Sequence, residues 1–504
     1  MAEYDYIVIG GGSAGCVLAA RLAASGDAPQ VLLIEAGPDP RGVSQITEPA
    51  LWASLARTSL DWGYDYAPSP HAGHRVIGLT RGKLLGGCGA VDALNWDRGH
   101  PADFDAWEDA GAEGWNHDTL LPYFRRAEDW EGGATDRRGA GGPLRVTRPP
   151  DPHPVAAGLL GAAAELGFKL LDDVNDGDNE GAGLANLTVR DGRRHSVVDG
   201  YLADVPRNLT VLTGSTAVRL GFDGGRCDSV FHTLAGTLTR TRARREVICA
   251  LGAIGTPLLL LRSGIGDPAD LARLSVPVRA TLPGVGRNLA DHPLVAGVRF
   301  RARQRLGLTR DNGGGAILSW RSEGADRPDL QAFVTQGPLA GGRAGGDIFA
   351  LTPGLMAPES SGYLRVHPDG VEIQPNFLAA PADVLALAEG MEMVMDLAET
   401  SAYRELIAAP VAPPRRLSRA DAETFVRENC SSYSHPCGTA AIGASPEDGA
   451  VVDPALRVFG VAGLRVADAS VIPVIPRCGL AAPVVAIAER AAGLITGAAS
   501  SPAS

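Results

Sequence analysis

The chain has little cysteine, no long apolar run and no excess of basic residues, and each absence excludes a class of protein. Its 504 residues contain 7 cysteines and no Cys-x-x-Cys pair. A disulfide scaffold or a structural zinc site is therefore not expected, and we predict no metal. No apolar run reaches the roughly 18 residues of a membrane helix, so no membrane attachment is expected. The net charge of −12 argues against a nucleic-acid-binding surface.

The composition is that of an ordinary globular protein, with 45% hydrophobic and 21% charged residues. An apolar run begins as early as Tyr4, which leaves no room for a signal peptide. We therefore expect a cytoplasmic, reduced protein that is a monomer or a dimer. The length is sufficient for two or more domains.

A glycine turn between two apolar runs is the most informative motif. The run 4–9 leads into the turn 10–15, a helical segment follows, and a second apolar run at 31–34 is closed by Glu35. Glycine at the first position permits the tight turn, and glycine at the third lets the backbone approach a pyrophosphate. A carboxylate 20 residues beyond the last glycine suits the hydroxyls of a ribose. The motif predicts a dinucleotide site without identifying the dinucleotide.

Later segments predict an α/β fold in which the nucleotide domain is discontinuous. Helices are expected at 155–166 and 254–261, and strands at 208–212, 217–220 and 246–250. From about residue 293 alternating polarity indicates an antiparallel sheet with one solvated face, followed by a long helix at 380–407 with apolar residues on one face. We expect residues 38–80 to be irregular and 131–152 to form a polar loop. Strand, turn and helix return after residue 445. The predicted nucleotide domain comprises 1–150, 195–292 and 440–504, and the substrate domain comprises 151–194 and 293–439.

Four groups of segments together resemble the glucose–methanol–choline (GMC) family of FAD enzymes. They match that family in order and spacing over nearly the whole chain. The segments are the glycine turn; Arg81 to Phe104; Gly252 to Gly266 with Leu282 to Pro293; and Ser434 to Thr439 with Leu464 to Pro473 and Pro483 to Arg490.

The resemblance implies a Rossmann-like FAD domain and a substrate domain built on an antiparallel sheet with flanking helices. The active site is expected between them. Residues 86–95 are expected to line the flavin ring, Asp468 and Ala469 to lie near the pyrophosphate, and Val218 near the adenine. The position at which some relatives attach the flavin through histidine is Val91 here, so non-covalent FAD is expected. The predicted cofactor-binding residues are Gly10, Gly12, Ser13, Ala14, Gly15, Glu35, Ala36, Arg81, Gly86, Gly87, Gly89, Ala90, Val91, Asp92, Ala93, Leu94, Val218, Ala250, Gly252, Asp468, Ala469 and Ala481.

The resemblance also assigns His435 as the base that accepts the proton of a substrate hydroxyl, a role suited to a group that titrates near neutral pH. His292, between Asp291 and Pro293, is interpreted as a structural turn residue. The family's second catalytic group is a His or Asn two residues before the proline of the last helix. This chain has Ala481 there, with Gly479 as its neighbour, so half of the catalytic pair is absent.

Three interpretations of this gap are open. His435 acts alone, or with help from Asn95, Asp92 or Cys478. Alternatively, Gly479 and Ala481 make room for a bulky substrate, with Trp96 and Cys478 lining its site and Arg477 binding an anionic or polar part. In the third, the enzyme desaturates, cleaves a C–C bond as a lyase, or keeps FAD as a structural group.

The predicted function is oxidation of a specialised small-molecule substrate that bears a hydroxyl group, by hydride transfer to flavin. Reoxidation of the flavin is left to O₂ or to an unknown redox partner. The alternative is an FAD-containing lyase, or a desaturating enzyme of a biosynthetic pathway, on the same scaffold.

Overall fold

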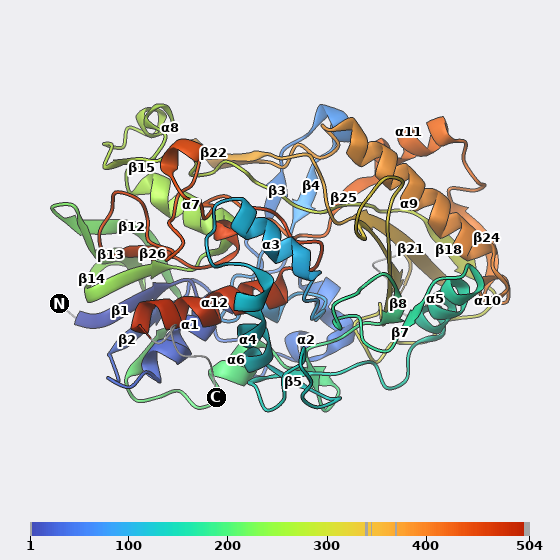
Figure 1. Cartoon of the computed structure of the whole chain (residues 1–504), viewed down its shortest axis with the longest axis horizontal. Coiled ribbons are helices and arrows are strands. Elements are labelled where there is room, and N and C mark those ends of the chain that lie inside the picture. Colours follow the sequence, from blue (N-terminus) through green and yellow to red (C-terminus); the bar gives the residue numbers. More distant parts are fainter. Residues whose placement is uncertain (1–2, 338–340, 344, 368–369, 498–504) are drawn as a thin grey trace.

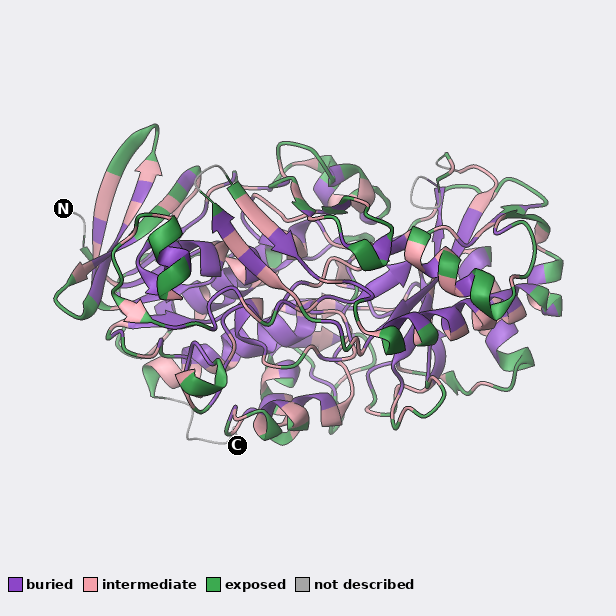
Figure 2. Cartoon of the chain, turned by 90° about the horizontal axis from the view of Figure 1, so that it is seen from above, coloured by how far each residue is buried: buried purple, intermediate pink, exposed green. Residues whose placement is uncertain are grey.

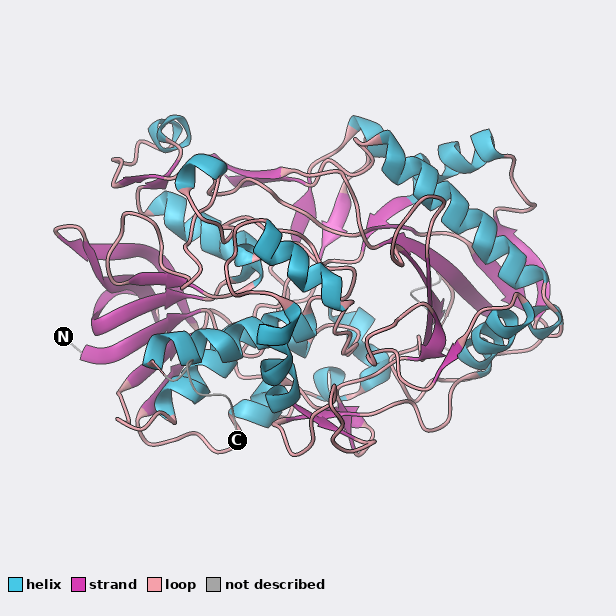
Figure 3. Cartoon of the chain, viewed as in Figure 1, coloured by secondary structure: helices cyan, strands magenta, loops and turns pink. Residues whose placement is uncertain are grey.

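Two large β-sheets, each covered by helices, lie beside one another along the long axis of the molecule (Figure 3). The computed structural model describes residues 3–337, 341–343, 345–367 and 370–497. The succession of sheets and helices confirms the predicted α/β class. Buried residues run through both sheets (Figure 2), and their side chains form one main apolar core.

The first sheet is mainly parallel and carries the N-terminal glycine turn at its edge. Its strands follow the order β11-β2-β1-β14-β13-β12, with β26 paired to β14 (Figure 1). The members are β1 (Glu3–Ile9), β2 (Val31–Ile34), β11 (Leu209–Leu212), β12 (Ser215–Asp223), β13 (Arg226–Leu234), β14 (Thr237–Cys249) and β26 (Leu464–Val466). Ile9 is paired with Cys249, and Cys249 with Val466. Because these strands are parallel, the loops after β1, β14 and β26 emerge at the same edge.

Helices α1 (Ser13–Ala23) and α12 (Ala481–Thr496) pack against each other beside this sheet (Figure 1). A buried carboxylate joins them, because Glu489 of α12 accepts hydrogen bonds from the guanidinium of Arg21 in α1, with Nη2 at 2.7 Å. The hydroxyl of Tyr201 at the end of α6 (Val197–Tyr201) donates to the same carboxylate over 2.6 Å. The first and last helices of the domain are thus fixed to each other at their inner faces.

The second sheet contains nine strands and is mainly antiparallel, as predicted. Its order is β24-β18-β21-β20-β19-β8-β7, with β17 pairing with β21 and β25. The members are β7 (Leu170–Leu171), β8 (Gly181–Leu184), β17 (Pro293–Val295), β18 (Arg299–Ala302), β19 (Ala316–Trp320), β20 (Leu330–Gln336), β21 (Ile348–Leu355), β24 (Ile407–Ala412) and β25 (Cys430–Ser432). All of these strands come from 151–194 and 293–439, whereas the first sheet comes from the other three segments. We propose to assign the two domains by this division.

The long helix predicted at 380–407 is shorter in the structure. Helix α9 (Pro381–Glu399) buries the expected apolar stripe against the second sheet. Thr400 then takes an extended backbone conformation with ψ of 162°. This breaks the helix before the short α10 (Ser401–Arg404). Side-chain periodicity alone does not locate such a break, because both segments keep apolar residues facing the core.

Three other segments differ from the prediction. The alternating run 363–367 forms β22 (Tyr363–His367), which pairs only with β23 (Gly370–Gln374) and lies outside the large sheet. The loop 131–152 contains β6 (Leu144–Val146), which pairs with β5 (Glu128–Trp130). Residues 38–80 contain a short helix and two short strands, α2 (Ser44–Thr47), β3 (Tyr64–Tyr66) and β4 (Ile77–Leu79). β3 pairs with β4 and β5 pairs with β6 across intervening loops, and such pairings are not apparent from the pattern of a single segment.

None of the described helices is long and apolar enough to cross a membrane. The remaining elements complete the fold. They are α3 (Pro101–Asp109), α4 (His117–Ala127), α5 (Pro154–Glu165), α7 (Gly252–Arg262), α8 (Pro268–Arg273), α11 (Arg419–Asn429), β9 (Val189–Arg190), β10 (Arg193–Arg194), β15 (Ile265–Gly266) and β16 (Ala280–Thr281).

Candidate active site

The turn after β1 is built so closely that only glycine fits at two of its positions. Gly10 has φ of +98°, and a Cβ there would lie 2.5 Å from the carbonyl oxygen of Ala250. A Cβ on Gly15 would lie 1.8 Å from the carbonyl oxygen of Gly10. Helix α1 therefore starts directly at the turn. Its N-cap, Gly12, offers no side chain to the first N–H groups of the helix, which leaves them suited to an anion such as a phosphate.

Glu35 follows β2 and holds its carboxylate against the same turn. One carboxylate oxygen accepts a hydrogen bond from the N–H of Gly11 over 2.9 Å, and the other accepts from the N–H of Gly37 over 2.7 Å. Burial raises the pKa of Glu35 above its usual value. The predicted carboxylate is therefore fixed beside the glycine turn, and Ala36 continues the loop.

Asp468 occupies the corresponding place after β26. Its carboxylate accepts from the N–H of Gly252 over 2.8 Å and from the hydroxyl of Thr256 over 2.6 Å. It also accepts from the N–H of Ser470 over 2.8 Å, which fixes the short turn that begins at Ala469. Asp468 thus joins the loops after β14 and β26.

Val218 lies at a bulge in β12. The pairing of β12 with β13 includes Ala217 and Arg219 but skips Val218. Its backbone groups are therefore outside the ladder, as a backbone contact to an adenine requires.

The second glycine-rich loop, 81–95, lies against the first. The N–H of Gly86 donates to the carbonyl of Gly11 over 2.7 Å. A Cβ on Gly87 would lie 2.6 Å from the Cα of Gly12, and one on Gly89 would lie 2.7 Å from Oγ of Ser13. The structure thus brings this loop to the start of α1. Its other predicted cofactor residues are Arg81, Ala90, Val91, Asp92, Ala93 and Leu94.

His435 makes a direct ring-to-ring contact with His292. The two Nδ1 atoms are 3.0 Å apart, and Nε2 of His292 lies 3.1 Å from the carbonyl oxygen of Pro476. A carbonyl only accepts hydrogen bonds, so Nε2 of His292 carries the proton and its Nδ1 accepts. Nδ1 of His435 must then be the donor. Nε2 of His435 is left without a proton, with its lone pair available.

The environment keeps both imidazoles neutral. Burial lowers the pKa of His292 to about 3. Desolvation lowers the pKa of His435 well below its usual value of 6.5, with smaller effects of His292 and Arg81.

The backbone and ring of His435 are also held in place. The carboxylate of Asp291 accepts a hydrogen bond from the N–H of His435 over 2.8 Å. The ring of Tyr433 stacks on the imidazole with centroids 5.4 Å apart. The orientation of Nε2 is therefore fixed from three sides, by Asp291, His292 and Tyr433.

Gly479 leaves space beside the free nitrogen of His435. A Cβ built on Gly479 would lie 3.8 Å from Nε2 of His435 and 4.0 Å from Cβ of Asp97, with no closer atom. Ala481 is the first residue of α12, whose N-terminus has no side-chain cap among the described residues. The two small residues therefore stand where the family pattern places polar side chains.

Two of the other residues proposed to help His435 already have side-chain partners. The carboxylate of Asp92 pairs with the guanidinium of Arg194 at 2.7 Å. The side-chain oxygen of Asn95 accepts from the amide of Asn312 over 3.0 Å. Cys478 is buried, and a Cβ on Gly99 would lie 2.9 Å from its sulfur.

The predicted substrate contacts Trp96 and Arg477 also have protein neighbours. The indole N–H of Trp96 donates to Glu128 over 2.9 Å. The guanidinium of Arg477 lies 3.6 Å from the Asp326 carboxylate, and its backbone N–H donates to Asp103 over 3.0 Å. Their roles toward a substrate stay predictions.

Sequence reasoning missed two residues beside His435, namely His292 as a hydrogen-bond acceptor and Asp97. His292 and His435 are 143 residues apart in the chain, so no spacing rule joins them. Asp97 lies directly between Trp96 and Arg98. An acidic residue between a tryptophan and an arginine is a weak sequence indication of a functional position.

The chain belongs to the GMC oxidoreductase family. The family's N-terminal model matches residues 4–294, and its C-terminal model matches residues 358–488. These matches confirm the resemblance seen in the sequence. Members of this family act on CH–OH donors, and the family implies FAD as cofactor.

Similar proteins include a dehydrogenase and two oxidases. Human mitochondrial choline dehydrogenase is 34% identical, over 98% of this chain and 90% of its own. Among solved structures, pyridoxine 4-oxidase from Mesorbium loti has a TM-score of 0.92 and 33% identity, over 97% of this chain and 98% of its own. A formate oxidase of Aspergillus oryzae RIB40, whose structure concerns FAD modification, has a TM-score of 0.91 and 26% identity, over 99% and 98%.

Proposed function

We propose that this GMC oxidoreductase oxidises an alcohol by using Nε2 of His435 to remove the hydroxyl proton. The observation that carries the proposal is the chain of hydrogen bonds from the Pro476 carbonyl through His292 to Nδ1 of His435. This chain leaves Nε2 as the only basic atom of the ring. A neutral imidazole with one fixed lone pair is what a general base requires.

The residues that meet at the first sheet fit non-covalent FAD. The uncapped start of α1 suits the pyrophosphate, Glu35 suits the ribose, and the bulge at Val218 offers backbone groups for the adenine. The position of covalent attachment in some relatives is Val91, which has no nucleophilic atom. When bound, FAD supplies the hydride acceptor. The uncapped N-terminus of α12 provides a positive helix end for negative charge that develops beside it.

The loss of the second catalytic group favours a substrate larger than a simple alcohol. Asp92 and Asn95 are engaged by Arg194 and Asn312, so neither replaces the missing His or Asn. Gly479 and Ala481 leave space next to His435 instead. Both dehydrogenase and oxidase occur in the names of similar proteins, so O₂ and another acceptor are both compatible with this chain.

Anaerobic addition of substrate to the FAD-loaded enzyme tests the proposal. A panel of alcohols should include some that bleach the flavin absorbance, and His435→Ala should retain FAD while losing this bleaching. Reduction of the variant at the wild-type rate would refute the role of His435. Product formed without bleaching would instead support a lyase on the same scaffold.

A further inference from the structure

Asp97 is a carboxylate within the candidate site that has no cationic neighbour. Other acids nearby are paired, such as Asp92 with Arg194 and Asp103 with Arg327. The groups that face Asp97 are the backbone N–H groups of Gly99 and Gly479, the amide of Gln331 and the carboxylate of Asp103, and none of them is cationic. Among the described residues no ion pair includes Asp97. Asp97 is half-buried, and charges held largely away from water are normally paired, so a cation from outside the chain would complete this site.

The pocket next to Asp97 has hydrogen-bond acceptors to spare. It is lined by Asp97 and Asn179 together with Val174, Gly181, Ile317, Ser319 and Gln331. The side-chain oxygen of Asn179 is buried and has no hydrogen-bond partner in the described part of the chain. Asn179 therefore leaves one acceptor next to Asp97 without a donor from the described residues.

Asp97 lies close to the space beside His435, because both residues flank Gly479. The built Cβ position on Gly479 is 3.8 Å from Nε2 of His435 and 4.0 Å from Cβ of Asp97. Gly479 therefore lies between His435 and the carboxylate-bearing residue Asp97. A substrate whose hydroxyl meets His435 would place an atom a few bonds away next to Asp97.

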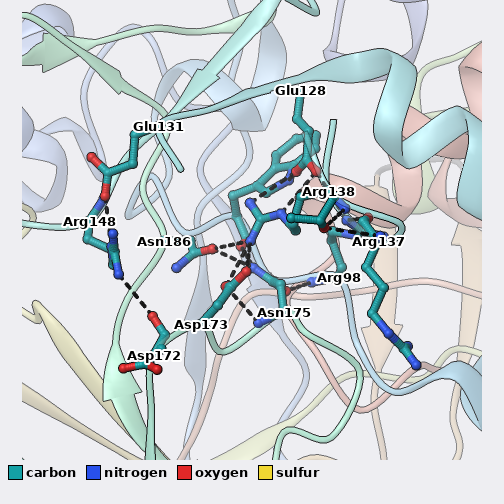
Figure 4. A network of polar contacts seen from close by, with 12 residues as sticks. Arg98, Glu128, Glu131, Arg137, Arg138, Arg148, Asp172, Asp173, Asn175 and Asn186 are labelled. Carbon is teal, nitrogen blue, oxygen red and sulfur yellow. Dashed lines mark hydrogen bonds and ion pairs between the residues drawn. The ribbon is translucent and has the colours of Figure 1, made fainter. Parts of the chain in front are cut away.

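Asp97 is held rigidly by contacts on both sides of it in the chain. The side chain of Asn175 accepts from the N–H of Arg98 over 2.7 Å and donates to the carbonyl of Trp96 over 2.8 Å. Asn175 also donates to Asn186 over 2.9 Å (Figure 4). The backbone on both sides of Asp97 is therefore held by the side-chain amide of Asn175, which Asn186 holds in turn.

A buried network of ion pairs supports these hydrogen bonds and engages the nearby arginines. Glu128 pairs with Arg98 at 3.1 Å and with Arg138 at 3.0 Å (Figure 4). Arg138 also pairs with Asp173 at 2.7 Å and donates to the side-chain oxygen of Asn186 over 2.8 Å. Because these guanidinium groups face Glu128 and Asp173, they are not available to neutralise Asp97.

We propose that Asp97 is a specificity-determining residue that binds a protonated amine of the substrate, so that the substrate is an amino alcohol. The inference rests on the proposed function of His435, which engages the hydroxyl end. The ammonium group donates to the carboxylate of Asp97. The guanidinium of Arg477 already faces Asp326. The site therefore favours binding of a cationic substrate over an anionic one.

Binding of a pair of isosteric, unreactive ligands tests Asp97 separately from catalysis. The probes are 2-methoxy-N,N-dimethylethanamine, which is cationic, and 1-methoxy-3-methylbutane, its neutral counterpart. Neither has a free hydroxyl. The dissociation constant of each is measured from the flavin absorbance change of the FAD-loaded enzyme at pH 8. The proteins are the wild type, Asp97→Asn, and Glu180→Gln, a control that removes a charge near the pocket where Glu180 pairs with Arg321.

The wild type and Glu180→Gln should bind the cation about 10- to 100-fold more tightly than the neutral ether, as expected for a charge-assisted hydrogen bond. Asp97→Asn should lose this preference and bind the neutral ether as before. Equal binding of both ethers by the wild type, or an unchanged preference in Asp97→Asn, would overturn the proposal. If the preference depends on Asp97 but no alcohol bleaches the flavin, the binding inference stands and the proposed function fails.

Discussion

Nδ1 of His292 and Nδ1 of His435 lie 3.0 Å apart, and the first can only accept the proton of the second. This relationship makes His292 a positioning residue for the proposed base. It determines which nitrogen of His435 is basic, and it does so without contact with a substrate. A structural turn residue would have no such influence on the chemistry.

Replacing His292 should therefore change the pH dependence of flavin reduction as well as its rate. In His292→Leu the Nδ1–H of His435 loses its acceptor, so the other tautomer becomes accessible. We expect reduction about 10- to 100-fold slower, with little change in the dissociation constant of the substrate. Because His292 contributes to the lowered pKa of His435, the acidic limb of the profile should move to higher pH. Stopped-flow reduction from pH 5 to 9 measures both effects.

His292→Asn is the matched control, because an amide can accept from His435 through its oxygen and donate to the Pro476 carbonyl through its nitrogen. His292→Asn should recover part of the rate of flavin reduction, and the acidic limb of its pH profile should return toward that of the wild type. If both variants slow reduction equally and leave the profile unmoved, His292 has only a structural role.

Restoring a polar group at the start of α12 should widen the range of substrates. In Ala481→Asn the new amide stands at the family's second catalytic position, where it can hold a substrate oxygen. Reduction by small primary alcohols is expected to rise about tenfold or more, since one member of such a pair contributes roughly 10²–10⁴ in rate. The rate for each alcohol is compared with that of Ala481→Ser, whose shorter side chain should gain less. No gain in either variant would favour a specialised substrate or a non-standard reaction.

Much of the cofactor region could be predicted from the sequence, because its residues are constrained locally. Gly10 is a glycine because its φ and the nearby Ala250 carbonyl exclude a side chain. Glu35 follows a short apolar strand at a regular distance. These requirements are expressed within single stretches of chain, and parallel strands then bring the loops to one edge.

The part of the site around His435 and Asp97 could not be predicted in the same way. The neutral, oriented state of His435 depends on His292 and on the Pro476 carbonyl, which belong to three distant segments. The isolation of Asp97 depends on Arg98 and Arg138 being occupied by Glu128. Such properties arise from which partners remain free after folding, and no local pattern records them.

The carboxylate of Glu489 should be important for stability. Its side chain is fully buried and binds Arg21 and Tyr201. Glu489→Ala leaves these groups without an acceptor, and we expect a loss of about 2–4 kcal/mol. Denaturant unfolding of the holoenzyme measures it. Glu180→Ala removes the exposed pair with Arg321 and should cost less than about 1 kcal/mol. Equal losses in the two variants would contradict the importance of the buried site.

The isolated carboxylate of Asp97 should also destabilise the substrate-free enzyme in a pH-dependent way. Burial raises the pKa of Asp97 from 3.8 to about 6. The folded state then binds the proton more tightly than the unfolded state, so stability falls as the pH rises from about 4 to about 6 and is level above that range. Asp97→Asn has no such proton to lose. Its melting temperature should equal that of the wild type near pH 4 and exceed it at pH 8.

A saturating protonated amine should reverse this order at pH 8, because it stabilises the wild type by binding next to the ionised carboxylate and has no such effect on Asp97→Asn. Thermal unfolding with and without 2-methoxy-N,N-dimethylethanamine measures both changes. A difference between the proteins that stays constant from pH 4 to 8 would mean that Asp97 is not held in an unfavourable charged state. Its isolation would then have another cause than substrate recognition. If the difference in melting temperature grows with pH and the amine cancels it, the destabilising charge of Asp97 is the one that binds the substrate.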